Sequence, residues 1–440
     1  MHELAHEFTH RRVSPWGGIK FFQQTYARMG VKADLLGVNL PLGGSNRAYD
    51  RVDMIEGFLV SVVLGSKRLA HSGWLRMDEI IREIFGWQRP MASASTYSRF
   101  FQRFDIDRND AVFPVLMKKW WDKISLKKMT IDIDSTVITR YGRQEYAEKG
   151  YNPHKPNRTS HHPLMAFCDE LKMVVNAWMR SGDSHSSTDM DRFLEELLQI
   201  IEPGRIGLLR GDRGFYGDRI MGQLERTGDG LPYIIRARMT TRLQEAIMDQ
   251  EDWYANNDVV RGAQYTSFQY QATKWSNSRC IVVVRVPASH ETKRRQGSLF
   301  PGMDNYEYSA YVTNTDFSEV MVHSQYNQRA DCENRIKELK YDYGVDGFAL
   351  HSFGAMEAAF RFIMIAYNLM AMFKQKVMTS KIKHRLSTIR FQCIAIGSYL
   401  VKDGRNKKLK LSAEGKRRHF LEHFFDNLDL IKPPIRFSNA

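Results

Sequence analysis

The sequence predicts an α/β protein in which a sheet flanked by helices follows a helical N-terminal region and is interrupted by a β-rich insertion. Three observations predict this fold class. Hydrophobic residues in 1–120 recur with mainly helical spacing, whereas strand-like alternation begins at Met129. From there strands and helices follow one another, which is typical of a mixed sheet covered by helices. After residue 236, a group of aromatic and β-branched runs breaks this order and predicts the insertion.

These changes of pattern divide the chain into five predicted parts. They are a helical N-terminal domain (1–120), the first part of the sheet-bearing core (125–235), the β-rich insertion (236–313), the second part of the core (314–375) and a basic C-terminal region (376–440). The most apolar stretch, Ala355–Phe373, contains Glu357, Arg361 and Asn368. A membrane-spanning helix rarely carries three such residues, so we expect a buried core helix and no membrane association.

In the N-terminal domain, Ile55–Leu64 is an apolar run and Met77–Phe85 is a helix candidate that ends at Gly86. Ser93 or Ser95 can then cap a further helix. That helix carries Arg99 and Arg103, which we take as candidate DNA-binding residues. The pattern fits a helix-turn-helix DNA reader and also an ordinary helical hairpin with a basic, solvated face.

The core contains five predicted strands and one helix between them. The strands are Met129–Ile138, Leu164–Cys168, Met173–Trp178, Arg205–Arg210 and Tyr233–Ala237, and the helix is Asp189–Leu198. The insertion is predicted to contain the strands Tyr265–Tyr270, Ile281–Val286 and Tyr306–Val312, with an exposed loop at Glu291–Gly302. Helices are expected to resume at Ser318.

The chain of 440 residues is basic, with 64 Lys and Arg against 50 Asp and Glu and a net charge of +14. This excess favours a polyanionic partner, nucleic acid first, over charge that serves solubility alone. The dispersed cysteines Cys168, Cys280, Cys332 and Cys393 indicate a reducing compartment without a disulfide framework. Met1–Arg12 lacks an apolar signal segment, so we expect a cytoplasmic protein.

Acidic residues occur where an α/β protein places its ligands. Asp132 and Asp134 are two residues apart on one predicted strand, so their side chains share a face. Asp212 follows the apolar strand 205–210, and open sheets bind ligands at the carboxyl ends of their strands. Glu333 lies on a helix predicted in the second part of the core.

One face of that helix combines a phenol, a carboxylate and two cations. At about 100° per residue these side chains lie within an arc of about 60°; they are Tyr326, Arg329, Glu333 and Lys340. Lys337 adds a cation one turn after Glu333. We expect Tyr326, Arg329, Lys337 and Lys340 to contact DNA, because cations hold phosphates next to a site of phosphodiester chemistry.

Carboxylates that converge without a cation repel one another, whereas Mg²⁺ prefers hard oxygen ligands. Asp134, Asp212 and Glu333 are therefore candidate catalytic and metal-binding residues, and Asp132 is a further candidate metal ligand. A pair of Mg²⁺ ions, for which Mn²⁺ is expected to substitute, can activate the attacking oxygen and stabilise the leaving oxygen in phosphodiester cleavage.

These residues resemble those of a known family. The spacing Tyr326-x2-Arg329-x3-Glu333-x6-Lys340 resembles the YREK signature of DDE transposases from bacterial insertion sequences. Asp134-Ser135-Thr136 and Gly211-Asp212-Arg213-Gly214-Phe215 resemble the first and second acidic blocks of that family. The segments ENRIKELKYDYG and SHHPLMAF are similar to the thirteen-eighty family of insertion sequences, and LPLGGSNRAYDR and STYSRFFQRF extend the resemblance over nearly the whole chain.

The resemblance implies a ribonuclease H-like catalytic core whose β-rich insertion lies between the second Asp and the Glu. It implies a DNA transposase that uses Mg²⁺ to cut double-stranded DNA at terminal inverted repeats and joins the 3′-OH ends to target DNA. It favours Asp134 as the first catalytic Asp, with Asp132 as a residue that assists or replaces it. Residues 1–120 would bind the DNA ends, and pairing two ends favours a homodimer associated with the bacterial nucleoid.

Two alternatives remain open at this point. A metal-dependent DNA nuclease without strand transfer would need the same carboxylates, because one site can use either water or a 3′-OH as its nucleophile. A DNA-binding repressor with a catalytically inactive site would share the basic charge, although the combination of Asp134, Asp212 and Glu333 argues against it.

Overall fold

A computed structural model describes residues 4–45, 47–185, 187–288, 305–380, 382 and 384–437. The chain forms two compact units, each assembled from separate stretches of sequence. Unit 1 consists of Met1–Ile124, Gly142–Glu145 and Lys337–Ile435, and unit 2 consists of Ser125–Tyr141, Tyr146–Ile336 and Arg436–Ala440.

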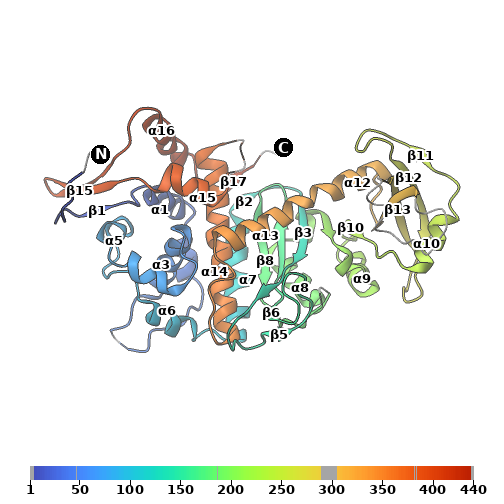
Figure 1. Cartoon of the computed structure of the whole chain (residues 1–440), viewed down its shortest axis with the longest axis horizontal. Coiled ribbons are helices and arrows are strands. Elements are labelled where there is room, and N and C mark those ends of the chain that lie inside the picture. Colours follow the sequence, from blue (N-terminus) through green and yellow to red (C-terminus); the bar gives the residue numbers. More distant parts are fainter. Residues whose placement is uncertain are drawn as a thin grey trace. The chain divides into compact units, whose positions relative to one another are not determined.

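Among the described residues, unit 2 contains a nine-stranded sheet in the order β11-β12-β13-β14-β10-β9-β3-β7-β8 (Figure 1). The strands are β3 (Met129–Ser135), β7 (Leu164–Cys168), β8 (Met173–Trp178), β9 (Ile206–Gly211), β10 (Tyr233–Arg236), β11 (Tyr254–Ala255), β12 (Gln264–Tyr270), β13 (Arg279–Pro287) and β14 (Tyr306–Thr313). β3, β9 and β10 are parallel neighbours. The other pairs are antiparallel, with β7 and β8 beside β3 and β14 to β11 beyond β10.

The strands predicted for the core are confirmed, and β7 and β8 have the predicted bounds. All five residues of β7 are buried, as are Ile131 and Ile133 of β3. Because all five residues of β7 are buried, both faces of this strand are covered, and its sequence is an apolar run without alternation. The physical reason that these segments form strands is therefore their β-branched and aromatic content together with burial.

The strands predicted for 236–313 extend the core sheet, because β14 pairs with β10 through Ile235 and Val312. Beyond this pairing a hydrophobic cluster forms between the strands and the helix that follows them. The cluster includes Tyr265 of β12, Val282 of β13 and Val322 of the next helix. The loop predicted at Glu291–Gly302 lies outside the described residues.

The remaining elements of unit 2 are helices and a small second sheet. The helices are α8 (Met190–Ile200), η2 (Pro203–Arg205), η3 (Arg213–Phe215), α9 (Asp218–Arg226), α10 (Thr241–Met248), α12 (Glu319–Gln328) and the first part of α13 (Ala330–Asp342). The small sheet has the order β4-β6-β5, formed by Ile138–Thr139, Thr159–His161 and Glu148–Lys149. The helical segment predicted from Ser318 is thus divided at Arg329 into α12 and α13.

Unit 1 is mainly helical. Its elements are β1 (Val13–Ser14), α1 (Ile19–Arg28), α2 (Val31–Leu36), α3 (Arg51–Val63), η1 (Leu69–His71), α4 (Ser72–Leu75), α5 (Glu79–Phe85), α6 (Ala94–Phe101), α7 (Ile106–Asp122), α14 (Phe353–Met372), the π-helical segments η5 (Phe373–Met378) and η6 (Arg390–Ile394), α15 (Leu386–Ile389), β15 (Ser398–Asp403), β16 (Asn406–Leu411) and α16 (Gly415–Asp429). The short strands β2 (Ile124–Ser125) and β17 (Ile435–Arg436) occur where the chain passes from one unit to the other.

Helix α14 is the centre of unit 1, where it contacts α1, α3, α6 and α7 (Figure 1). The segment Phe353–Met378 is long and apolar enough to cross a membrane, but its most apolar window is fully buried within the protein. The charges on α14 compensate each other, because Arg361 pairs with Glu357 at 3.0 Å. Asn109 of α7 donates to Gly354 O at 2.9 Å. The prediction of a buried core helix is confirmed.

The predicted helix boundaries near the N-terminus are also confirmed. Helix α5 ends at Gly86, whose φ of 72° is a left-handed conformation that favours glycine. Ser93, and not Ser95, caps α6, because its hydroxyl accepts a hydrogen bond from Thr96 N at 3.3 Å.

The division into units differs from the predicted boundaries in two ways. The C-terminal region joins the N-terminal helices in unit 1, where β15 pairs with β1. The segment predicted as the second part of the core divides after Ile336, since α14 belongs to unit 1. A helix that is apolar on all sides must be enclosed by other helices, and local sequence patterns do not show which helices enclose it.

Candidate functional site

Unit 2 contains an open cavity of about 1040 Å³ at the carboxyl ends of its parallel strands. Asp134, Asp212 and Glu333 all line it. The other lining residues are mostly basic or polar: Tyr151, His162, Asp183, Ser184, His185, Arg213, Gly214, Arg236, Ala237, Arg238, Met239, Tyr326 and Arg329. The structure therefore brings the three predicted carboxylates to one cavity that also carries several cations.

Strand register brings two of these carboxylates together. β3 and β9 are parallel, with Ile133 opposite Gly211, so Asp134 and Asp212 follow at adjacent strand ends. Asp212 caps η3, because its Oδ1 accepts a hydrogen bond from Gly214 N at 2.8 Å. Glu333 reaches the same cavity from the first turn of α13.

Folding disfavours the ionised form of Asp134. Burial raises its pKa to about 6, and the charges of Asp212 and Glu333 add to this, while Arg329 and the backbone N–H of Ser135 oppose it. Like charges in one low-dielectric site raise each other's pKa. The three carboxylates therefore lie close enough to influence one another electrostatically.

Arg329 partly compensates the charge of Asp134. Its Nη2 lies 3.1 Å from Asp134 Oδ1 and donates to Ile133 O at 3.1 Å. Burial lowers the pKa of this guanidinium, but the surrounding acidic groups, Asp134 foremost, together outweigh burial and raise the pKa overall. Arg329 Nε is buried without a hydrogen-bond partner among the described residues. The pair is therefore joined through a single nitrogen.

Each of the three carboxylates keeps oxygen atoms that could bind a cation. Asp134 Oδ2, Asp212 Oδ2 and both carboxylate oxygens of Glu333 have no partner within the described part of the chain. Such oxygens are the ligands that Mg²⁺ prefers. In the described residues no three His, Cys, Asp or Glu side chains are yet close enough to hold one ion.

Asp132, the further candidate metal ligand, lies on the same strand as Asp134 but is not among the residues that line the cavity. It is fully buried and faces Arg210, its register partner on β9. Arg210 donates from Nε to Asp132 Oδ1 at 2.6 Å and from Nη2 to Asp132 Oδ2 at 2.9 Å. Both carboxylate oxygens are therefore already bound in a bidentate ion pair.

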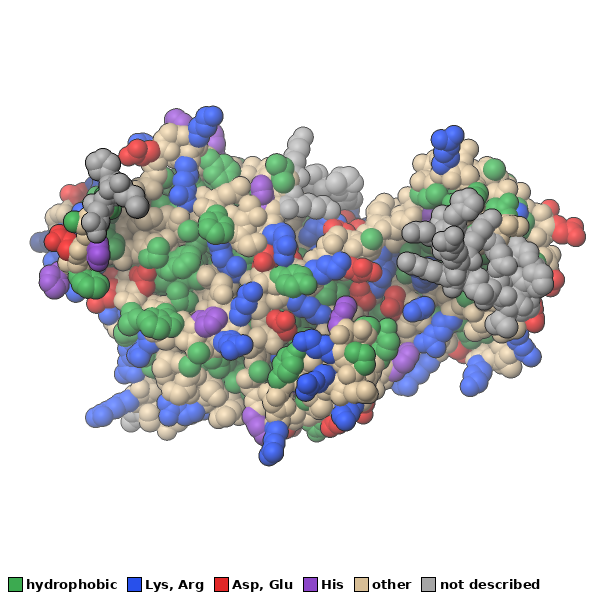
Figure 2. Space-filling model, in the orientation of Figure 1, with side chains coloured by type: hydrophobic (Ala, Val, Ile, Leu, Met, Phe, Trp, Pro, Cys, Tyr) green, Lys and Arg blue, Asp and Glu red, His purple; other side chains and the backbone are tan. Residues whose placement is uncertain are grey.

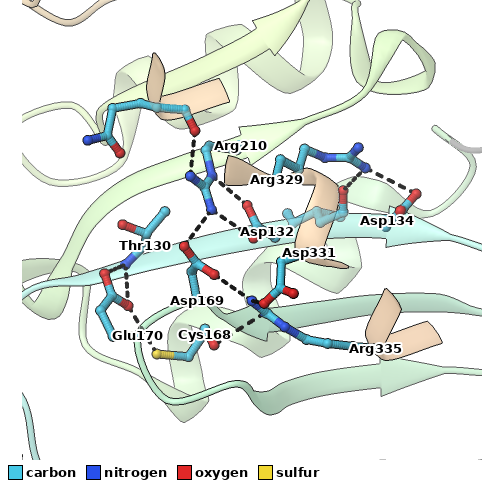
Figure 3. A network of polar contacts seen from close by, with 12 residues as sticks. Thr130, Asp132, Asp134, Cys168, Asp169, Glu170, Arg210, Arg329, Asp331 and Arg335 are labelled. Atoms are coloured by element: carbon cyan, nitrogen blue, oxygen red, sulfur yellow. Dashed lines mark hydrogen bonds and ion pairs between the residues drawn. The ribbon is translucent and has the colours of Figure 1, made fainter. Parts of the chain in front are cut away.

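This ion pair is the first link of a larger buried network (Figure 3). Arg210 Nη2 also lies 3.0 Å from Asp169 Oδ2, and Arg335 of α13 pairs with Asp169 Oδ1 and with Asp331 Oδ2. Although burial alone would raise the pKa of Asp169, Lys172 and the two arginines lower it to about 2. The network thus connects β3, β9, the end of β7 and α13 through ion pairs.

Several lining residues were not identified from the sequence. Arg236 and Arg238 are two residues apart at the end of β10, the parallel neighbour of β9. The argument that located Asp212 at a strand end could have located them. His162 also lines the cavity; its Nδ1 lies 2.7 Å from the carbonyl of Ser184 and must donate to it.

The residues predicted to contact DNA differ in their burial and in whether they line the cavity. Tyr326 is only 8 % exposed, with its ring 4.7 Å from that of Tyr311 between centroids. Lys337 is exposed and Lys340 half-buried on α13, and neither lines the cavity. Arg99 and Arg103 are exposed in unit 1 and line a separate pocket of about 410 Å³ together with Arg47 and Arg51.

The positive charge of the protein is distributed. Basic side chains are spread over the face shown in Figure 2 and are interspersed with acidic ones. The arginines of the cavity and those of the pocket in unit 1 are therefore defined by their local geometry more than by one continuous basic patch.

Comparisons with known proteins identify the family. A family model described as "Transposase DDE domain group 1" matches residues 2–433. A comparison with curated proteins found no match. Among solved structures, a cryo-EM structure of a piggyBac transposase synaptic complex with hairpin DNA is 12% identical, with a TM-score of 0.44 over 98% of this chain and 89% of that chain.

Proposed function

The chain belongs to the DDE-domain transposases, and we propose that it cuts double-stranded DNA at terminal inverted repeats and joins the freed 3′-OH ends to target DNA. The observation that carries this proposal is the meeting of Asp134, Asp212 and Glu333 at one cavity. These residues come from β3, the end of β9 and α13, which are far apart in the sequence. We further propose that the chain belongs to the thirteen-eighty family of insertion sequences.

The strand arrangement supports a ribonuclease H-like catalytic core. In chain order the first five strands of the nine-stranded sheet are β3, β7, β8, β9 and β10, and they lie in the order β8-β7-β3-β9-β10. The first three are antiparallel neighbours, and the last two run parallel to β3. In this proposal β11–β14 are the β-rich insertion, since they lie between Asp212 and Glu333 in the chain.

In the proposed site, Asp134, Asp212 and Glu333 hold two Mg²⁺ ions, with Mn²⁺ able to substitute. When bound, these ions would polarise the phosphodiester and lower the pKa of the attacking hydroxyl or water. Asp134 contributes a carboxylate that burial alone disfavours, so a cation is its natural partner. Arg329 supplies part of that charge when no metal is bound.

The arginines of the cavity are proposed to bind the DNA backbone. Arg213, Arg236 and Arg238 are exposed at the cavity wall, where guanidinium groups can bind phosphates on either side of the scissile bond. Arg99 and Arg103 of unit 1 would bind the DNA end outside the site. Because two element ends are processed together, we propose a homodimer as the active form.

A cleavage assay on the DNA that flanks the gene tests this function. Labelled duplexes carrying each flank should be nicked at the repeat in Mg²⁺, and a pre-cleaved end should be joined to a plasmid target. Asp212→Ala and Glu333→Gln should retain DNA binding and lose cleavage. Glu251→Gln is the matched control, because Glu251 is exposed in the same unit and lines no part of the cavity.

The outcomes separate the alternatives. Full cleavage by Asp212→Ala or Glu333→Gln would overturn the assignment of the site. Cleavage without any joined product would indicate a nuclease, and repeat binding without cleavage in Mg²⁺ or Mn²⁺ would indicate a repressor.

A further inference from the structure

We propose that the buried network of Asp132, Arg210, Asp169, Arg335 and Asp331 positions the three site carboxylates and sets their affinity for metal. This inference rests on the proposed function, because it assumes that Asp134, Asp212 and Glu333 bind the metal. In this role the network residues are positioning residues, which act through the carboxylates without touching metal or DNA. We refer to them below as the positioning network.

Each site carboxylate is two residues away from a member of the positioning network. Asp132 precedes Asp134 by two residues on β3, and Arg210 precedes Asp212 by two at the end of β9. Arg335 follows Glu333 by two residues on α13. Each site carboxylate therefore has a network residue two positions away on its own element, so a shift of that network residue moves the backbone that carries the carboxylate.

Contacts between the network residues connect the elements that carry the site carboxylates. Arg210 joins β3 to β9 through Asp132 and also donates to Gln325 O of α12. Arg335 joins α13 to the end of β7 through Asp169. The three elements that carry the carboxylates are thus connected by ion pairs (Figure 3). Asp132, Arg210 and Arg335 are buried, and Asp169 and Asp331 are partly exposed.

Strand hydrogen bonds already hold β3 against β9, but no backbone ladder can hold a helix to a sheet. The position of Glu333 relative to Asp134 and Asp212 therefore depends on side chains. Arg335 lies one half-turn from Glu333 and is 4 % exposed, and Lys172 also pairs with Asp331 at 3.1 Å. Charged groups at such burial hold one geometry because breaking a single partner leaves an uncompensated charge.

Metal affinity is the readout that separates positioning from general stability. Mn²⁺ binding to the full chain without DNA would be followed by the electron paramagnetic resonance signal of the free ion, beside thermal unfolding in EDTA. Arg210→Met and Arg335→Met should each weaken Mn²⁺ binding by about tenfold, the effect expected of residues that orient metal ligands. The milder Asp169→Asn removes the charge of the carboxylate between Arg210 and Arg335 but leaves both arginines in place, so it should weaken binding less.

Arg279→Met is the matched control. Arg279 lies in the same unit, is 5 % exposed, and pairs with Asp218 at 2.7 Å and Glu225 at 2.6 Å, away from the cavity. It should lower the melting temperature while leaving the Mn²⁺ dissociation constant within about twofold of wild type, because none of its partners orients a site carboxylate. Asp212→Asn serves as the reference for loss of a metal ligand.

Each outcome has a distinct meaning. If Asp212→Asn weakens Mn²⁺ binding and the folded network variants do not, the positioning role is wrong and the proposed site stands. If Arg279→Met weakens binding as much as Arg210→Met, the effect is general destabilisation and the inference is also wrong. If Asp212→Asn has no effect, the metal site itself is wrong. Should Arg210→Met fail to fold, Asp169→Asn and Arg335→Lys decide, since Lys keeps the charge of Arg335 without its paired donors.

Discussion

Two aspartates of β3, each paired with an arginine from another element, differ in their surroundings. Asp132 and Arg210 are both fully buried and share two hydrogen bonds, of 2.6 and 2.9 Å. Asp134 and Arg329 meet through one nitrogen at 3.1 Å, beside a cavity that two further carboxylates line. Both carboxylate oxygens of Asp132 are hydrogen-bonded by Arg210, so this pair has a structural role. The charge of Asp134 is only partly compensated by Arg329. Residue type is the same in both pairs, so only the surroundings separate a structural acid from a candidate catalytic one.

The largest expected difference between the pairs is in folding stability. Asp132→Asn should lower the free energy of unfolding by about 3 kcal/mol or more, because Arg210 then keeps a buried charge with one partner fewer. Asp134→Asn should change it by less than about 1 kcal/mol, since the charge of Asp212 still acts on Arg329. Urea unfolding in EDTA measures both. Equal losses of unfolding free energy for the two variants would show that Asp132 and Asp134 contribute equally to stability, contrary to this prediction.

Metal binding at the cavity carboxylates should account for the stabilisation of the protein by Mn²⁺. At a Mn²⁺ concentration of about 100 times the dissociation constant, wild type should gain about 2.7 kcal/mol of unfolding free energy. Asp134→Asn should gain much less, whereas Asp252→Asn, a variant of an exposed acid in the same unit, should gain as much as wild type. Unfolding curves at matched pH with and without Mn²⁺ provide the measurement. Undiminished stabilisation of Asp134→Asn would show that the ion binds elsewhere.

The two regions should respond oppositely to pH. The pKa of Asp134 is about 6 in the folded protein and about 4 when unfolded, so the folded state binds this proton more tightly and loses stability as pH rises from 4 to 6. The pKa of Asp169 is about 2, so its contribution is complete above pH 4 and is lost as pH falls toward 2.

These signs are tested by the unfolding free energies of Asp134→Asn and Asp169→Asn relative to wild type in EDTA. Asp134→Asn should gain on wild type between pH 4 and 6, and the deficit of Asp169→Asn should shrink below pH 4. A pH-independent difference for either variant would contradict the corresponding assignment.

The smallest expected effect concerns arginines that have no carboxylate partner. Arg47 and Arg99 line the pocket in unit 1 and form no ion pair with any residue in the described ranges. If they bind DNA phosphates, the double variant Arg47→Ala/Arg99→Ala should weaken binding to all duplexes alike. It should also reduce the slope of log affinity against log salt by about 1 to 2. Filter binding at several salt concentrations measures this slope, and an unchanged slope would exclude the contacts.

Local sequence patterns predicted most of the secondary structure. β7 and β8 have the predicted bounds because each is an apolar run between polar turns. Helix α6 begins after Ser93 because a serine hydroxyl satisfies an N–H group that the first turn leaves unpaired. What these patterns did not predict is that β14 joins β10, or that α14 packs in unit 1, since both depend on partners distant in the chain.

The candidate site followed partly from the same reasoning. Strand-end position indicated Asp212 and helical spacing indicated Glu333, and the structure places both at one cavity with Asp134. Arg236 and Arg238 were missed because no spacing rule connected the end of β10 to the end of β9. Their proximity to the site depends on the parallel pairing of Ile235 with Gly211.

The sequence by itself determined the acidic side chains, the strands and helices that carry them, and the shared face of Asp132 and Asp134. Only the tertiary structure decided that Asp132 is held in an ion pair while Asp134 lines the cavity, because it places Arg210 opposite Asp132 and leaves Asp134 at the strand end. The physical reason is that alternation along a strand specifies a face, whereas the charge that an acid meets on that face depends on the register with a neighbouring strand about 80 residues away.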